Sequence, residues 1–339
     1  MTAGPTPSTF EAAAAAGIHC LPIPTPFLVG RVNCYLIDDE PLTLVDTGPN
    51  SGKSLDELEQ ALAAHGRSVE ELELIVLTHQ HMDHVGLLEI LSRRSGAAVA
   101  ALAPLAPYLA DWSASAAADD EFAQQTMRRH GTPVELTTVL GAVGAAFRAF
   151  GSGGPVTQLL SEGDELAFRD RTLRVLHRPG HSPTDTLFWD EQRRMVIGGD
   201  HLLAHISSNP LVSRPLDRSA GDDGSRPHAL LMYLESMEKT RSLELELVLP
   251  GHGESITDHV SLIDERFRMH QRRARKLLAL LGPGPLSAYE LAVQMWGNIA
   301  VTQAFLTISE VLGHLDLLVR DGHVAEHERD GVVRFEALG

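Results

Sequence analysis

Four potential metal ligands fall within six consecutive positions of the chain. His79, His81, Asp83 and His84 form a His-x-His-x-Asp-His segment directly after the apolar run LELIVLT. Imidazole and carboxylate groups together suit Zn²⁺, which binds histidine nitrogens at roughly 2.0–2.1 Å. Adjacent residues of a strand point to opposite faces, so a loop is needed to bring all four together. If His79 and His81 face one ion, Asp83 and His84 can turn toward a second.

Three further candidate ligands each follow a glycine later in the chain. The segments are Pro179-Gly180-His181, Gly199-Asp200 and Pro250-Gly251-His252. A glycine beside a ligand lets the backbone turn sharply and approach an ion closely. One such segment would be weak evidence, but the complete set in this order is highly specific. The sequence therefore predicts a metal site formed by His79, His81, Asp83, His84, His181, Asp200 and His252.

Strands and helices must position these residues. Short β-rich runs punctuated by Pro and Gly occupy about 19–48, and a helix follows. The apolar run that ends before His79 fits a strand buried on both faces, whose carboxyl end is where layered α/β proteins bind ligands. Strand signals return between 164 and 200, and helices are predicted at 229–242 and 258–281. We expect an α/β (α+β) domain over 19–281.

Two segments and the tail have a different character. The Ala-rich stretch 103–155 predicts a helical insertion that either forms a lid or merely covers a sheet edge, and 205–228 predicts a loop. After the linker GPGP, residues 286–339 predict helix, helix and a hairpin with an Asp330-Gly331 turn, the order of a winged-helix-like domain. Residues 1–18 have no basic segment followed by an apolar one and predict a loose leader.

Composition limits the classes of function. The 28 Lys and Arg against 45 Asp and Glu give a net charge of −17, which argues against a generic nucleic-acid-coating protein. No apolar run approaches the roughly 18 residues of a membrane span, so no membrane partner is expected. Cys20 and Cys34 are too few for a disulfide framework. A cytoplasmic location is the default expectation.

Together with Leu44-Val45-Asp46-Thr47-Gly48, these motifs resemble the metallo-β-lactamase fold superfamily of metallohydrolases over about residues 19–255. The resemblance implies a four-layer αββα sandwich with two metal ions, Zn²⁺ or alternatively Fe or Mn, at one edge between the sheets. It assigns one ion to three histidines, the second to Asp83 and two histidines, and the bridge to Asp200. Asp46 is similar to the acid that supports the ligand loop. The first ion's ligands are then His79, His81 and His181, and the second ion's are Asp83, His84 and His252.

The leading hypothesis is a dinuclear zinc hydrolase of an ester, thioester or lactone. Two ions bridged by Asp200 would generate a bridging hydroxide near neutral pH, and Asp83 could relay a proton. Asp200 stands where the common clinical zinc β-lactamases place a Cys, so antibiotic hydrolysis is not favoured. The pocket for a small-molecule substrate would be built by 103–155 and 205–228, with His201 and Asn209 as candidate contacts.

Three alternatives remain at this level. The tail is similar to that of a branch that adds a winged-helix-like domain to a glyoxalase-II-like core, some of whose members are endoribonucleases. That tail and the basic run 265–276 suggest a metal-dependent phosphodiesterase acting on RNA, which the net charge disfavours. The others are a mononuclear iron dioxygenase of the persulfide type and a non-catalytic regulator that senses a metal. The tail is expected to pack on the core or on a second subunit of a homodimer.

Overall fold

Two β-sheets form the centre of the molecule in the computed structural model, which describes residues 10–216 and 226–338. The first sheet has the order β1-β2-β3-β4-β5-β6 and the second β11-β10-β9-β8-β7. In the first, β1 to β3 are antiparallel and β3 to β6 parallel; in the second, only β10 and β11 are parallel. The strands are β1 (Ile18–Ile23), β2 (Val32–Ile37), β3 (Thr43–Val45), β4 (Leu74–Val76), β5 (Ala98–Leu102), β6 (Gln158–Leu160), β7 (Glu165–Ala167), β8 (Thr172–His177), β9 (Thr186–Asp190), β10 (Met195–Gly199) and β11 (Leu247–Pro250).

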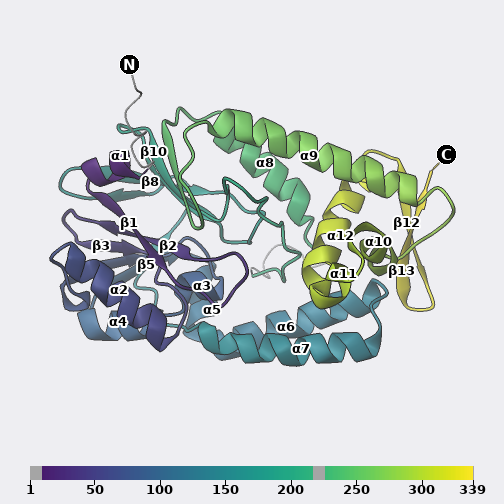
Figure 1. Ribbon diagram of the computed structural model, residues 1–339, viewed down its shortest axis with the longest axis horizontal. Coiled ribbons are helices and arrows are strands. Elements are labelled where there is room, and N and C mark those ends of the chain that lie inside the picture. The colour runs from purple at the N-terminus through teal and green to yellow at the C-terminus, as the bar shows by residue number, and fades with distance from the viewer. Residues whose placement is uncertain (1–9, 217–225, 339) are drawn as a thin grey trace, which may run out of the picture.

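Helices cover the outer face of each sheet (Figure 1). α2 (Gly52–Ala64) and α4 (Leu88–Ser95) pack on the first sheet through one apolar layer. A second layer, which includes Tyr35 and Phe188, lies between the sheets. A third joins the second sheet to α8 (Ala229–Arg241) and α9 (His259–Leu280). These three apolar layers confirm the expected four-layer αββα sandwich.

The segment between β5 and β6 is helical, as α5 (Leu105–Ala110), α6 (Trp112–Arg129) and α7 (Val134–Phe147). α6 and α7 pair and run away from the sandwich along the lower edge in Figure 1. Short 3₁₀ turns occur at Val69–Glu71 and Arg148–Phe150. The described part of the 205–228 segment, 205–216 and 226–228, contains neither helix nor strand.

The C-terminal unit has its own apolar core. It consists of α10 (Ala288–Trp296), α11 (Ile299–Thr302), α12 (Ala304–Arg320), β12 (Val324–Arg329) and β13 (Val332–Ala337). The strands pair as a hairpin whose turn, Asp330 and Gly331, has positive φ at both residues. The likeness to a winged helix stays a prediction.

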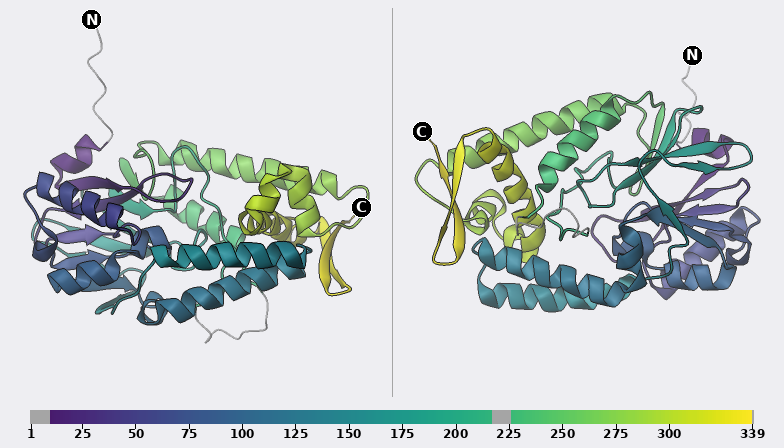
Figure 2. Two further views of the ribbon diagram at one scale, coloured as in Figure 1. Left: turned by 60° about the horizontal axis from the view of Figure 1, so that its bottom comes forward. Right: turned by 180° about the vertical axis from the view of Figure 1, so that it is seen from behind.

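Two helical pairs connect the sandwich to this C-terminal unit (Figures 1 and 2). α8 and α9 pack against α12 on one side. On the other side the C-terminal end of α6 reaches the unit. There Tyr289 N of the C-terminal unit donates to His130 O at 3.1 Å, and Arg129 lies 3.4 Å from Glu328. The C-terminal unit is therefore fixed to the sandwich at two places.

The start of the chain differs from the loose leader expected over 1–18. Residues Glu11–Ala15 form helix α1, and Ala13 is buried in the layer between the sheets. β1 already begins at Ile18. Residues 1–9 lie outside the described part of the chain. No described helix is both long and apolar enough to cross a membrane.

Candidate metal centre

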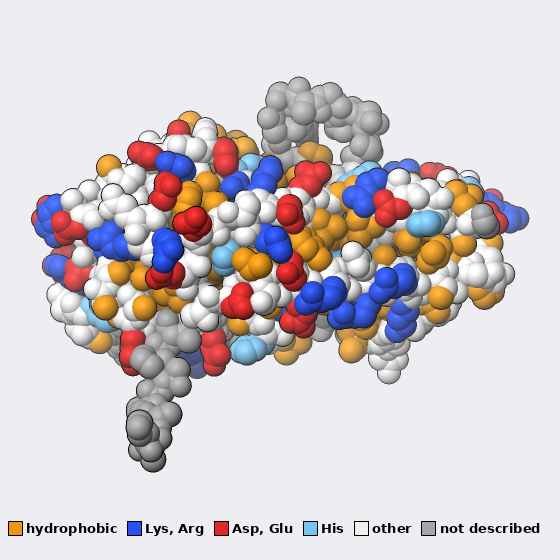
Figure 3. Space-filling view, turned by 90° about the horizontal axis from the view of Figure 1, so that it is seen from above, with side chains coloured by type: hydrophobic (Ala, Val, Ile, Leu, Met, Phe, Trp, Pro, Cys, Tyr) orange, Lys and Arg blue, Asp and Glu red, His pale blue; other side chains and the backbone are white. Residues whose placement is uncertain are grey.

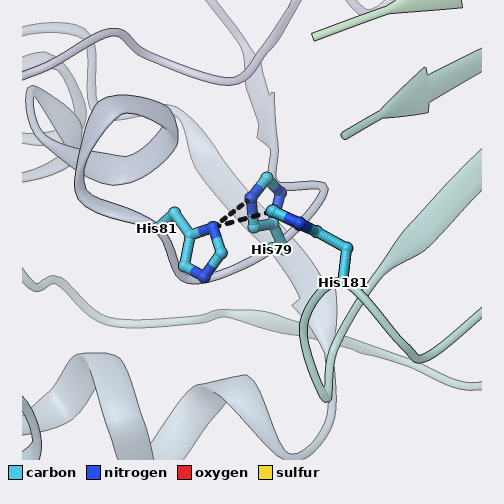
Figure 4. A group of neighbouring side chains, drawn as sticks. All are labelled: His79, His81 and His181. Atoms are coloured by element: carbon cyan, nitrogen blue, oxygen red, sulfur yellow. Dashed lines mark hydrogen bonds between the residues drawn. The ribbon is translucent and has the colours of Figure 1, made fainter. Parts of the chain in front are cut away.

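Three of the predicted ligands converge where β4 and β8 end. His79 and His81 occupy the loop between β4 and the short helix α3 (Met82–Val85), and His181 follows β8. His81 Nδ1 lies 3.0 Å from His79 Nε2 and 3.0 Å from His181 Nε2, so the three nitrogens face one point (Figure 4). All three side chains contribute ligand atoms that lie within 4.8 Å of one another.

A second group lies directly beside the first. Asp83 and His84 come from α3, and His252 follows β11. His252 Nε2 lies 3.3 Å from Asp83 Oδ2. Asp200, which follows β10, lies between the groups: its Oδ1 is 3.5 Å from His84 Nε2, and its Oδ2 is 3.5 Å from His252 Nε2 and 3.6 Å from His181 Nε2. The structure thus brings all seven predicted ligands together.

The donor atoms fit metal ions better than they fit one another. Ligands about 2.05 Å from a tetrahedral ion are about 3.3 Å apart, close to the separations observed here. Within the described residues, His84 Nε2 and Asp200 Oδ1 are buried without a hydrogen-bond partner. Buried polar atoms are almost always paired, and coordination to a divalent cation is a pairing that fits these two atoms, which both point into the centre. The set of imidazole and carboxylate donors suits Zn²⁺ and similar divalent ions.

A family model for the metallo-beta-lactamase superfamily matches residues 28–252. That match covers well over half of the chain and contains all seven predicted ligands. The chain belongs to this superfamily.

Relatives extend this likeness beyond the matched segment. The chain is 32% identical over 316 residues to the probable metallo-hydrolase YqjP of Bacillus subtilis, covering 93% of this chain and 96% of that protein. It superposes with TM-score 0.76 and 27% identity on a metallo-beta-lactamase family protein of Thermus thermophilus, covering 95% and 99% of the two chains. It is also 27% identical over 181 residues to an atrochrysone carboxyl ACP thioesterase of Aspergillus fumigatus, covering 53% and 51%.

Asp46 ties the ligand loop of this superfamily member to the end of β3. Its carboxylate accepts from Thr78 N at 2.9 Å, from Thr78 Oγ1 at 2.8 Å and from His84 Nδ1 at 2.7 Å. Asp46 adopts φ of +60°, an uncommon conformation for a residue with a side chain, which aims the carboxylate at the loop. Because Asp46 occupies His84 Nδ1, Nε2 is the ring nitrogen that points into the centre.

Backbone carbonyls and a hydroxyl orient other ligands in the same way. His252 Nδ1 donates to Arg31 O at 2.8 Å, and His181 Nδ1 donates to Asn209 O at 3.0 Å. Thr78 Oγ1, which donates to Asp46, accepts from His79 Nδ1 at 2.9 Å. Each bond fixes one tautomer and turns Nε2 inward. Sequence reasoning missed these partners, because every residue has a carbonyl and the motif does not mark which one is used.

Two of the glycines beside ligands are required by close packing. A Cβ on Gly251 would lie 2.3 Å from Asp200 Oδ1 and 2.8 Å from His84 Cε1, inside the metal centre itself. Gly180 has φ of +153°, and its Cβ would lie 2.4 Å from the backbone of Tyr233. The glycines before His252 and His181 therefore let the backbone pass close to its neighbours, as the sequence pattern indicated.

Burial and mutual charge set the protonation of the metal-free site. Burial together with neighbouring histidines lowers the pKa of His79 well below its ordinary value and that of His81 to about 3. Burial would also lower the pKa of His252, but the facing Asp200 and Asp83 outweigh it and raise the pKa to about 10. Burial would raise the pKa of Asp200, but His252 and His84 hold it well below its usual range. Charge is thus balanced in pairs when no ion is bound.

The two candidate substrate contacts have other surroundings. His201 is only 1% exposed, and its Nε2 lies 2.9 Å from Thr240 Oγ1 beneath α8, facing the interior rather than the centre. The side chain of Asn209 donates to Leu306 O at 3.0 Å, while its carbonyl accepts from His181. Contact of either side chain with substrate stays a prediction that these hydrogen bonds do not support.

Proposed function

We propose that the chain is a metal-dependent hydrolase that uses two Zn²⁺ ions to cleave an ester, thioester or lactone. The observation that carries this proposal is the position of Asp200 between the two ligand groups. Its Oδ1 faces His84 of the second group, and its Oδ2 faces both His181 of the first group and His252 of the second. A carboxylate between two ligand groups can contact an ion in each of them, which suits a dinuclear site. The superfamily membership and the hydrolase name of the Bacillus relative support the same reaction class.

The bound ions would supply the Lewis acidity and lower the pKa of water at the site. The chain's own side chains would orient the substrate and transfer protons. Burial would raise the pKa of Asp83, but His84 and His252 outweigh it and hold the pKa below its ordinary value. Asp83, whose Oδ2 lies 3.3 Å from His252 Nε2, is the carboxylate that would accept a proton from water and return it to the leaving group.

Among the described residues, two cysteines and a serine are the candidate nucleophiles to compare with water. Burial raises the pKa of Cys34 well above its ordinary value and that of Cys20 to about 12, so both thiols are protonated and unreactive. Ser182 Oγ donates to Asp185 Oδ1 at 2.7 Å, in a turn that carries His181, and has no histidine base. An activated water is the nucleophile that these residues leave.

The likeness to a carrier-protein thioesterase favours a carbonyl substrate. The test is initial rates of zinc-loaded protein on thioesters, simple esters and lactones beside phosphodiesters and RNA. Asp200→Ala should abolish turnover, whereas Asp170→Ala, at an exposed aspartate of the same charge, should leave it unchanged. Turnover of carbonyl substrates that survives in Asp200→Ala with both metals retained would overturn the proposal.

One observation favours a second candidate, a phosphodiesterase acting on RNA. Arg268, Arg272, Arg275 and Lys276 are exposed on one face of α9, and none forms an ion pair with the residues described. The view from the α9 side shows basic side chains gathered on this face (Figure 3). Unpaired cations on an acidic protein could bind a phosphate backbone. Salt-dependent RNA cleavage that is lost in Arg268→Gln/Arg272→Gln/Arg275→Gln would replace the carbonyl proposal with this one.

A further inference from the structure

A connecting loop, residues 201–212, runs from the metal centre into the C-terminal unit. It begins directly after Asp200, and Ser208 Oγ donates back to the carbonyl of Asp200. Twelve residues after Asp200, Val212 is buried in the apolar core of the C-terminal unit, and its N–H donates to Ser309 Oγ of α12 at 3.3 Å. The loop thus joins a candidate metal ligand to helix α12 without an intervening helix or strand.

Asn209 of this loop contacts both the metal centre and helix α12. Its backbone carbonyl accepts the Nδ1–H of His181 at 3.0 Å, and its side-chain Nδ2 donates to Leu306 O, in the first turn of α12, at 3.0 Å. No sheet ladder fixes the backbone of this loop, so the position of the Asn209 carbonyl depends on such side-chain bonds. One residue therefore contacts a candidate ligand on one side and the C-terminal unit on the other.

α12 is a rigid point of attachment. Most of its length is buried, with thirteen consecutive or nearly consecutive buried positions from Ala304 to Leu318. It packs against α8 and α9 of the sandwich, and Arg273 of α9 forms an ion pair with Glu310. A carbonyl in the first turn of such a helix is a fixed acceptor for the Asn209 amide.

We propose that Asn209 is a positioning residue through which α12 holds His181 in the orientation that binds metal. The C-terminal unit is then part of the scaffold of the metal centre. The bond from His181 Nδ1 directs Nε2 toward His81 Nδ1, and a loosened carbonyl would let the imidazole rotate away from that point. Groups that orient metal-bound histidines typically contribute roughly 10- to 100-fold to metal affinity.

This inference rests on the metal centre of the proposed function, but its test does not need a substrate. Apo protein is titrated with Co²⁺ and Zn²⁺, and the dissociation constants and the Co²⁺ visible absorption bands are recorded for Asn209→Ala and Asn209→Asp. Asp keeps the size of Asn but cannot donate to Leu306 O. Asn298→Ala, an exposed asparagine of the same C-terminal unit, is the matched control.

Both Asn209 variants should bind one metal equivalent roughly 10- to 100-fold more weakly and shift the Co²⁺ bands, while the other equivalent and the thermal unfolding of apo protein change little. With a turned-over substrate, kcat should fall and KM should stay within about twofold. Wild-type affinity and bands in both variants would overturn the inference. If neither variant folds, Ser309→Ala, which releases Val212 N, takes their place with the same expected result in smaller measure. Wild-type protein that binds two metals but hydrolyses nothing would refute the proposed function alone.

Discussion

Two buried clusters of histidine and carboxylate occur among the described residues, and they differ in how well they suit a metal ion. The first is the group around Asp200; the second, His270, Glu310 and His314, lies where α9 meets α12. In both, three side chains place ligand atoms within 4.8 Å of one another. Distances alone therefore do not separate the two clusters.

What separates them is the partner of each carboxylate. Asp83 and Asp200 face only imidazoles, and Asp200 Oδ1 has no hydrogen-bond partner among the described residues. At the second cluster Arg273 pairs with Glu310 and already supplies the positive charge. Two carboxylates that face three imidazoles suit a metal ion, whereas a single carboxylate that is already paired with an arginine suits a structural ion pair.

The histidines of the second cluster are hydrogen-bonded to each other, and His270 Nε2 has no hydrogen-bond partner among the described residues. His314 Nδ1 donates to Glu310 O at 2.6 Å, which leaves Nε2 to accept from His270 Nδ1 at 3.1 Å. Burial and the neighbouring His314 lower the pKa of His270 to about 3, and burial lowers the pKa of His314. Both rings are neutral near pH 7 and join α9 to α12 by a hydrogen bond.

The largest effect should come from removing the carboxylate between the two ligand groups. Asp200→Ala should lose most bound metal and reduce hydrolysis by about a thousandfold or more, because several kcal/mol of transition-state stabilisation are lost. Elemental analysis and initial rates measure both changes.

The matched control is Glu310→Ala at the other cluster. It should lower stability but leave metal content at the wild-type value, since Arg273 rather than an ion is its partner. Equal metal loss in both variants would show that the two clusters are of one kind.

A smaller effect is expected at the support of the ligand loop. Asp46→Ala removes the acceptor for His84 Nδ1 and Thr78 and should weaken metal binding by roughly 10- to 100-fold. Competition titration with a chelator of known affinity measures it. An unchanged dissociation constant would mean that the ligands themselves fix the loop.

The neutral histidine pair predicts a pH dependence of stability. Because the pKa of His270 falls from 6.5 in the unfolded chain to about 3 in the fold, the unfolded state binds more protons, and stability is lost as pH falls from about 6.5 toward 3. Arg273 and Arg266 face the same ring and add to this shift. At pH 5 the loss is about 2 kcal/mol.

His270→Gln cannot titrate and should show a flatter curve. The difference in unfolding free energy between wild type and variant, from urea denaturation at pH 7 and pH 5, isolates the contribution. A difference that does not change between the two pH values would show that the pKa of His270 is the same in the folded and the unfolded chain.

The structure brings together the seven candidate ligands that the sequence predicts, but their orientation could not be predicted from the sequence. The motif around His79 and the three segments in which a glycine precedes a candidate ligand form a specific pattern. The backbone beside such a residue passes so close to the centre that only glycine fits, as at Gly251. Of the predicted fold, the four-layer sandwich is confirmed by its three apolar layers. The spacing of apolar residues along the sequence indicates which faces of the helices and strands are buried, and these buried faces form the layers.

Contacts distant in sequence explain the rest. Asn209 follows Asp200 by nine positions, and the local sequence does not indicate that its side chain donates to Leu306 O, almost a hundred residues away. His201 lies beside a ligand in the chain, but the backbone turn after β10 directs it under α8. Local pattern carries no information on which distant carbonyl or helix completes such contacts.

The smallest and most discriminating effect concerns Arg273. The hypothesis is that the arginine makes the α9–α12 cluster a structural ion pair. Arg273→Ala should then leave the Glu310 carboxylate buried without its cation, with Glu310 Oε1 3.7 Å from His314 Nδ1. Zinc binding to the folded state would then stabilise the variant, with a shift of a few degrees in Tm at millimolar zinc in a protein already loaded at the first centre. Wild type, in which the guanidinium occupies the carboxylate, should show no such additional shift. Absence of the shift in Arg273→Ala would mean that ring geometry, not charge, decides which cluster binds an ion.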